Sequence, residues 1–61
     1  MTPLELDKKI ASLKTSLEVI RIYQVQMIEQ IGKRRYNNLL NDVLDQYLFY
    51  TNLKNKQENE E

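Results

Sequence analysis

The side chains that could do chemistry in this sequence are few, because its 61 residues include neither histidine nor cysteine. Without them, the usual general base, thiol nucleophile and soft metal ligands are missing. Asp42 and Asp45 would lie one turn apart on a helix, but two carboxylates alone make a weak cation site. A single glycine also excludes a glycine-rich phosphate loop. We therefore expect a protein that is not an enzyme and that carries no metal or other cofactor.

Three consecutive cations, Lys33, Arg34 and Arg35, form the one basic cluster of the sequence. Beside backbone amides at a helix start, they could contact a phosphate or a nucleic-acid backbone. They could instead stabilise the negative C-terminal end of a preceding helix. The formal net charge is zero, and three charges fall short of the basic stripe of a dedicated nucleic-acid binder. We favour the structural interpretation and keep nucleic-acid contact as the alternative.

Aromatic side chains could act as platforms on which nucleic-acid bases stack. Here they occur at helical spacing among leucines and valines, which favours a place in the core or at a protein interface. Tyrosine suits an interface because it combines a large apolar ring with a polar tip. The aromatic residues are Tyr23, Tyr36, Tyr47, Phe49 and Tyr50.

Helices must position these groups, because the first half of the chain repeats apolar residues at alternating steps of four and three. This is the a/d spacing of a coiled-coil seam. The one polar member, Gln24, could specify register or oligomer state, or it could lie at a helix–helix rim with its amide in water. The first apolar series is Leu6, Ile10, Leu13, Leu17, Ile20, Gln24, Met27 and Ile31.

The first helix is expected over about residues 3–31. Thr2 can cap it, Pro3 suits its first position, and Glu5 stands where the partner in a capping box belongs. The only glycine, Gly32, comes one residue after the series ends at Ile31, where a helix-ending residue is expected.

A second apolar series starts out of phase after Gly32, whereas the first series, continued in phase, would fall on polar residues. We therefore predict a turn over residues 32–35 and a second helix over about residues 36–54. Residues 1–54 would then form an all-α, two-helix antiparallel hairpin, and the polar, acidic residues 55–61 would fray or be disordered. The second series is Tyr36, Leu40, Val43, Tyr47 and Tyr50.

A chain of this length buries only about 60% of its unfolded surface, so its core is marginal without a disulfide, a metal or a partner. We therefore expect the hairpin to associate, most simply as a dimer that forms a four-helix bundle. Ile22 and Val25 lie nearly opposite the first series on a helical wheel, which predicts a second covered surface; the alternative is simple exposure. The interface candidates are Ile22, Gln24, Val25, Tyr47, Phe49 and Tyr50.

The sequence has no apolar stretch of the length that a membrane span needs and no apolar signal-peptide core at its start, so we expect a cytoplasmic protein. The Met-Thr-x-Leu-Glu start, the basic turn with its glycine and the following tyrosine resemble small co-chaperones of type III secretion needle subunits. In size and layout the chain also resembles Rop-type plasmid RNA-binding dimers. The first resemblance implies a hairpin on a helical-repeat partner, and the second implies a four-helix dimer on RNA; neither assigns functional residues.

These observations predict a non-catalytic protein-interaction module, such as a small adaptor, co-chaperone or regulator. It would act through helix-face contacts with itself, with a helical partner protein, or with both. The alternative function is a Rop-like helical dimer that binds nucleic acid through the basic cluster.

Overall fold

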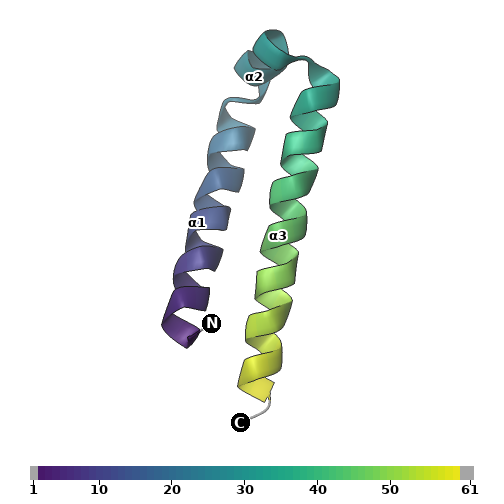
Figure 1. Ribbon diagram of the computed structural model, residues 1–61. Coiled ribbons are helices and arrows are strands. Elements are labelled where there is room, and N and C mark those ends of the chain that lie inside the picture. Colours follow the sequence, from purple (N-terminus) through teal and green to yellow (C-terminus); the bar gives the residue numbers. More distant parts are fainter. Residues whose placement is uncertain (1, 60–61) are drawn as a thin grey trace.

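The computed structural model describes residues 2–59 and is all-helical over that range, which confirms the predicted all-α class. Figure 1 shows three helices: α1 (Pro3–Ile22), α2 (Gln24–Ile31) and α3 (Lys33–Asn59). α3 runs back along α1, so that the C-terminal end of α3 lies near the N-terminal end of α1. None of the helices in the described part of the chain is both long enough and apolar enough to cross a membrane.

The start of α1 shows the Thr2 cap expected from the sequence. The Thr2 backbone is extended, and its hydroxyl oxygen accepts a hydrogen bond from the Glu5 N–H over 3.2 Å. Pro3 occupies the first turn, where its missing N–H costs nothing. Glu5 adds a negative charge at the positive end of the helix dipole.

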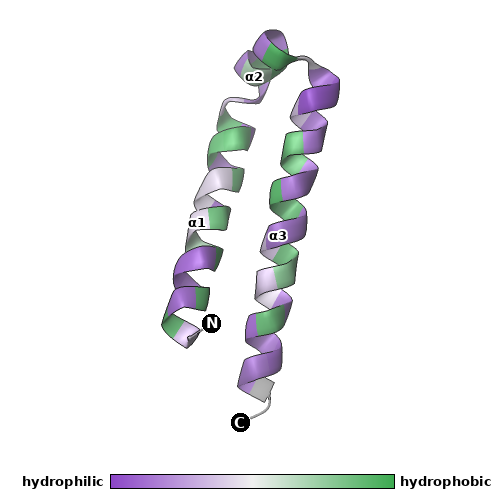
Figure 2. Cartoon of the chain, viewed as in Figure 1, coloured by the Kyte–Doolittle hydropathy of each residue, from purple (hydrophilic) through white to green (hydrophobic). Residues whose placement is uncertain are grey.

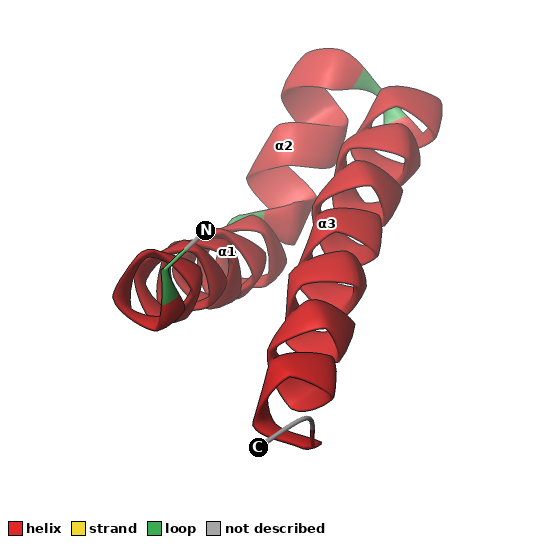
Figure 3. Ribbon diagram, turned by 60° about the horizontal axis from the view of Figure 1, so that its bottom comes forward, coloured by secondary structure: helices red, strands yellow, loops and turns green. Residues whose placement is uncertain are grey.

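The predicted helix over residues 3–31 is interrupted at Tyr23, which separates α1 from α2. Tyr23 leaves the helical region with φ −97° and ψ 21°, and Figure 3 shows α2 turned away from the axis of α1. The hydrogen bonds continue across the break, from the Tyr23 N–H to the Val19 oxygen and from the Met27 N–H to the Tyr23 oxygen. The break is therefore a bend in a continuous hydrogen-bonded segment and not a loop.

The predicted four-residue turn over 32–35 differs from the structure, in which Gly32 alone separates α2 from α3. Gly32 has φ 89° and ψ 155°, a combination that is essentially restricted to glycine. Its carbonyl oxygen accepts a hydrogen bond from the Tyr36 N–H over 3.0 Å, so the next helix begins at Lys33. One glycine is enough to reverse the chain, because its backbone angles produce a change of direction that the predicted turn would have distributed over four residues.

α3 is longer than the predicted helix over 36–54, because it extends through residues 55–59 of the expected frayed or disordered tail. Lys54 pairs with Asp7 of α1, and Gln57 is half-buried beside Pro3 and Leu6. These contacts hold the last turns of α3 against α1. Residues 60 and 61 of the predicted tail lie outside the described part of the chain.

The core is a thin line of side chains between α1 and α3, and Figure 2 shows apolar residues along the facing sides of both helices. Leu6, Leu13 and Ile20 from α1 are buried together with Tyr36 from α3. The molecule measures 47 × 16 × 14 Å, and its radius of gyration of 14.0 Å exceeds the roughly 10.5 Å of a compact domain of this length. A rod this thin leaves much of its apolar surface uncovered.

Candidate protein-interaction faces

The first apolar series splits into two lines in the folded chain. Leu6, Leu13 and Ile20, spaced seven residues apart, are buried between α1 and α3. The intervening residues Ile10 and Leu17 are only half-buried, and Gln24 is exposed. Positions seven apart share one side of a helix, so the second line forms an edge along α1 that α3 leaves partly uncovered.

The second line borders a groove between the helices, with a volume of about 400 Å³. A smaller hollow of about 220 Å³ opens near the chain ends, between Pro3 and Asp7 of α1 and Lys54 and Glu58 of α3. Pro3, Ile10 and Leu17 are spaced seven apart, as are Leu44, Thr51 and Glu58, so both hollows lie on one side of the pair. We call this side the groove face; its larger hollow is lined by Leu17, Arg21, Gln24, Tyr36, Asn37, Leu40 and Leu44.

Gln24 lies on the rim of this groove with its side chain exposed in the single chain. Two environments were predicted for Gln24, a buried position in a seam and a helix–helix rim with the amide in water. In the single chain, its exposed side chain corresponds to the rim. Whether Gln24 specifies the register or subunit number of an oligomer stays a prediction.

Ile22 and Val25 are 74% and 70% exposed, as expected for residues turned away from the other helix. The sequence placed them opposite the first series, but Ile22 lies next to the groove face. A hollow of about 440 Å³ is lined by Glu18, Arg21, Ile22 and Gln24, and the 400 Å³ groove shares Arg21 and Gln24 with it. The hollow at Ile22 therefore adjoins the groove face through the polar side chains of Arg21 and Gln24.

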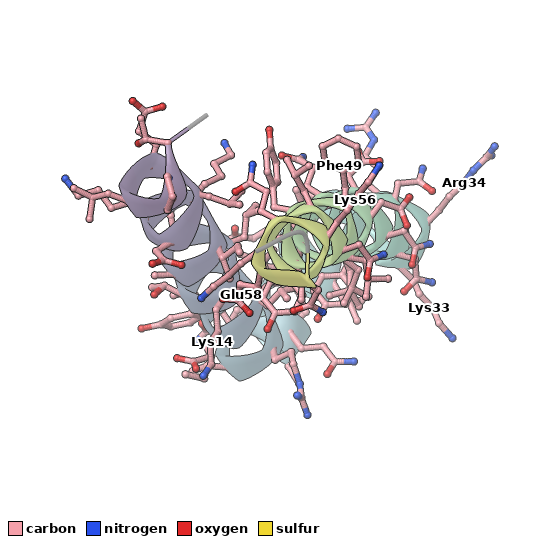
Figure 4. All side chains as sticks on the ribbon, turned by 90° about the horizontal axis from the view of Figure 1, so that it is seen from below. Lys14, Lys33, Arg34, Phe49, Lys56 and Glu58 are labelled. Atoms are coloured by element: carbon pink, nitrogen blue, oxygen red, sulfur yellow. The ribbon has the colours of Figure 1, made fainter. Side chains whose placement is uncertain are left out.

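The aromatic interface candidates lie elsewhere on the molecule. The Phe49 and Tyr50 rings meet edge to face, 5.2 Å apart at 87°, and the Lys9 ammonium lies 5.7 Å from the centre of the Tyr50 ring. Phe49 is 62% exposed, whereas Tyr47 and Tyr50 are half-buried. Figure 4 shows Phe49 and Glu58 on opposite sides of α3, so the structure does not bring Phe49 onto the groove face.

The basic cluster occupies the first turn of α3, which contains no acidic residue. Lys33, Arg34 and Arg35 are exposed, and Figure 4 shows Lys33 and Arg34 extending away from α1. The positive end of a helix dipole disfavours cations, so their position costs energy in α3 even though it follows the C-terminus of α2. The structural interpretation from the sequence, in which these charges only stabilise the preceding helix, is therefore incomplete.

One ion pair joins the two ends of the hairpin arms, and a second lies within α3. The Lys54 ammonium lies 2.7 Å from an Asp7 carboxylate oxygen and 3.9 Å from a Glu58 oxygen. The hydrogen bond and charge of Asp7 raise the pKa of Lys54 above its usual 10.5; desolvation lowers it and Glu58 raises it further, both to a smaller extent. All three side chains are substantially exposed, so these pairs orient the helix ends more than they stabilise them.

Asp42 and Asp45 are exposed on α3. Among residues 2–59, no group of three or more acidic side chains is arranged to hold a metal ion.

Two tertiary contacts were missed by reasoning from the sequence: the Asp7–Lys54 pair and a hydrogen bond from the Tyr36 hydroxyl to the Ile20 carbonyl oxygen. Both join residues far apart in the chain, which periodicity within one helix cannot reveal. The chain was also compared with known protein families, curated proteins and solved structures, and none of them matches it. The resemblances in size and helix layout therefore assign no family.

Proposed function

We propose that this chain is a non-catalytic protein-interaction module, a helical hairpin that functions with its exposed helix faces covered by another helical surface. That surface is a second copy, which gives a four-helix bundle, or a partner protein for which the chain serves as adaptor, co-chaperone or regulator. The proposal includes the cytoplasmic location expected from a sequence without cysteine.

The observation that carries this proposal is the mismatch between a small core and a large apolar surface. The buried core of the described chain consists of Leu6, Leu13, Ile20 and Tyr36. Large apolar side chains stay exposed along all three helices, although a soluble monomer rarely leaves extended apolar patches uncovered. These exposed residues are Leu4, Val19, Ile22, Tyr23, Val25, Ile31, Leu39, Leu44, Leu48 and Phe49.

The surface area supports the same proposal. The solvent-accessible surface is 5020 Å², whereas a compact monomer of 7.3 kDa has about 4,200 Å². The difference of about 800 Å² is the area that each partner buries in an interface of standard size. Covering one long face would therefore give the chain the surface expected of a compact protein.

Thermal unfolding at several protein concentrations tests this proposal for self-association. Binding to the folded state stabilises it by mass action, so the midpoint temperature of a dimer rises with protein concentration. A midpoint that is independent of concentration and lies above about 60 °C would instead describe a stable lone hairpin. For a different partner, the wild-type chain and an Ile22→Ser/Val25→Ser chain are compared as baits, and specific partners are retained by the wild type alone.

A nucleic-acid-binding dimer is the second candidate, and the position of the basic cluster favours it. Lys33, Arg34 and Arg35 stand at the positive end of α3 without a compensating acid, an arrangement that a bound phosphate would relieve. Binding to RNA and to duplex DNA is measured against salt for the wild type and for a Lys33→Ala/Arg34→Ala/Arg35→Ala chain.

A steep salt dependence that this variant loses would support nucleic-acid binding. The matched control is Lys8→Ala/Lys9→Ala/Lys14→Ala, which removes the same charge from α1. The absence of binding at about 50 mM salt, where phosphate contacts are strong, would contradict the second candidate.

A further inference from the structure

We propose that the bend at Tyr23 is a hinge and that the Tyr36 hydroxyl is the latch that keeps it bent. In the bent form, Tyr36 supplies the hydrogen bond that the Ile20 carbonyl oxygen would receive in a continuous helix. Without this latch, residues 3–31 form one straight helix. The inference goes beyond the proposed interaction function, because it gives the first arm of the hairpin two conformations.

The sequence around the bend favours a straight helix. Residues 4–31 contain neither glycine nor proline, and tyrosine does not break a helix. In a straight helix, Met27 would lie seven residues after Ile20 on the same side and would extend the buried line of α1. In the structure, Met27 is only half-buried. The local sequence therefore does not account for the bend.

Two helical hydrogen bonds are lost at the bend. The bonds donated by the Tyr23 and Met27 N–H groups are kept. Between them, a continuous helix would also use the N–H groups of Gln24 and Gln26, each bonded to the oxygen four residues before it, which is that of Ile20 for Gln24. Either bond would carry the helix through Tyr23, where it is interrupted, so both are missing from the described chain.

The Ile20 oxygen, which the bend deprives of its helical donor, accepts the Tyr36 hydroxyl instead, over 3.1 Å. This hydrogen bond is buried, and a buried carbonyl oxygen without a partner costs free energy. A side chain that inserts into the hydrogen-bond ladder of a helix is a known cause of a sharp kink. One acceptor therefore has two alternative donors, the Gln24 N–H in the straight form and the Tyr36 hydroxyl in the bent form.

The helix that the hinge moves, α2, lies between two joints, Tyr23 and Gly32 (Figure 3). Glycine tolerates a wide range of backbone angles, and no atom lies within 4 Å of a Cβ added at Gly32. None of the eight residues of α2 is buried. A change in the direction of α2 therefore opens no cavity in the core.

The hinge controls the shape of the 400 Å³ groove. The groove is lined by Arg21 before the bend, by Gln24 after it and by Tyr36 of α3. Gln24 is exposed in the bent form, whereas in a straight helix it would lie four residues after Ile20 on the side that faces α3. A partner that fills the groove therefore holds the hinge bent, and a partner that prefers the straight form releases the latch.

Amide hydrogen exchange measured by NMR tests the latch in the wild type and in Tyr36→Phe. In the wild type, the protection factors of Gln24 and Gln26 should be at least about fivefold lower than those of the hydrogen-bonded Tyr23 and Met27. In Tyr36→Phe, these differences should disappear, and the Cα chemical shift of Tyr23 should become helical. The variant still unfolds more easily than the wild type, because the straight form is the less stable of the two in the wild-type chain.

Tyr47→Phe is the matched control, since it removes a half-buried hydroxyl group from α3 without touching the bond to Ile20. Its protection factors at Gln24 and Gln26 should stay at the wild-type values. All chains are also measured in trimethylamine N-oxide, which favours the folded state of a marginal chain.

Three results would overturn the latch. The first is a wild-type chain in which Gln24 is as protected as Tyr23, and the second is a folded Tyr36→Phe chain in which Gln24 stays unprotected. The third is a Tyr36→Phe chain that does not fold even in the osmolyte, because the hydroxyl group would then hold the whole hairpin and not the hinge. The proposed interaction function is judged independently, by the concentration series and by the two baits.

Discussion

The Tyr36 hydroxyl donates a buried hydrogen bond to the Ile20 carbonyl oxygen over 3.1 Å and so fastens the start of α3 to the end of α1. The last carbonyls of a helix have no partner within it, and Ile20 belongs to the last turn of α1. The contact lies three residues before the bend at Tyr23, where a side chain that reaches the helix backbone is a known cause of a kink. This hydrogen bond therefore joins the two helices at the point where the first one bends.

Tyr36→Phe removes this hydrogen bond and keeps the ring. Because the Ile20 oxygen is buried, we expect the free energy of unfolding to fall by about 1–2 kcal/mol. Urea unfolding at one fixed protein concentration measures the change. Tyr47→Phe is the control, since the described residues offer the half-buried Tyr47 hydroxyl no such bond. Equal losses in the two variants would mean that the hydrogen bond does not stabilise the fold.

Gly32→Ala tests the one-residue turn. No atom lies within 4 Å of an added Cβ, so the cost comes from the backbone at φ 89°, and we expect about 1–3 kcal/mol. A chain of 61 residues can be made by chemical synthesis, which allows D-alanine at the same position. D-Alanine favours positive φ, so that variant should be at least as stable as the wild type. If both alanines destabilise the fold equally, the cause is not the sign of φ.

The elements fixed by local chemistry were predictable from the sequence, and those fixed by distant contacts were not. Thr2 and Gly32 act where the capping and helix-ending patterns placed them. The bend at Tyr23 and the helical end of α3 were missed; each lies beside a contact between distant residues, Tyr36 with Ile20 in the first case and Lys54 with Asp7 in the second. Neither partner can be recognised from the periodicity of one helix.

The candidate surfaces were only partly predictable for the same reason. The spacing of the first series identified Gln24 and Leu17 as members of one stripe, but the division into a buried and an open line appears only when α3 is in place. Lys33 was expected in a turn but lies in the first turn of α3. A phase break in the apolar pattern indicates that the chain reverses, but it does not show how few residues the reversal needs. Its place at a helix start follows from the backbone of Gly32.

Ile20 and Ile22 allow a comparison of the same residue in the core and on the surface. Ile20 is 5% exposed, and Ile20→Ala should cost about 2–5 kcal/mol, enough to unfold a chain with so small a core. Ile22 is 74% exposed, and Ile22→Ala should change the stability of the single chain by no more than about 0.5 kcal/mol. Circular dichroism with urea unfolding measures both. A large loss for Ile22→Ala that persists on dilution to the monomer would mean that the residue is covered within one chain.

The ion pair between Lys54 and Asp7 predicts a loss of stability at alkaline pH. Asp7 raises the pKa of Lys54 in the folded chain above its usual 10.5, so the stabilisation is complete below that pH and disappears as the pH rises through the higher folded value. Asp7→Asn should therefore be less stable than the wild type at neutral pH, and the difference should vanish in strong alkali. Urea midpoints of both chains against pH measure this difference, because pH effects common to the two chains cancel. A difference that is independent of pH would contradict the pairing.

Sedimentation equilibrium over a concentration series tests most directly whether this chain functions with its helix faces covered. We predict a species of twice the chain mass of 7.3 kDa at high concentration, with helical circular dichroism that falls as dilution releases the monomer. A fully helical monomer at low micromolar concentration, with a cooperative unfolding transition of its own, would contradict this prediction. Such a result would mean that the line of Leu6, Leu13, Ile20 and Tyr36 is a sufficient core.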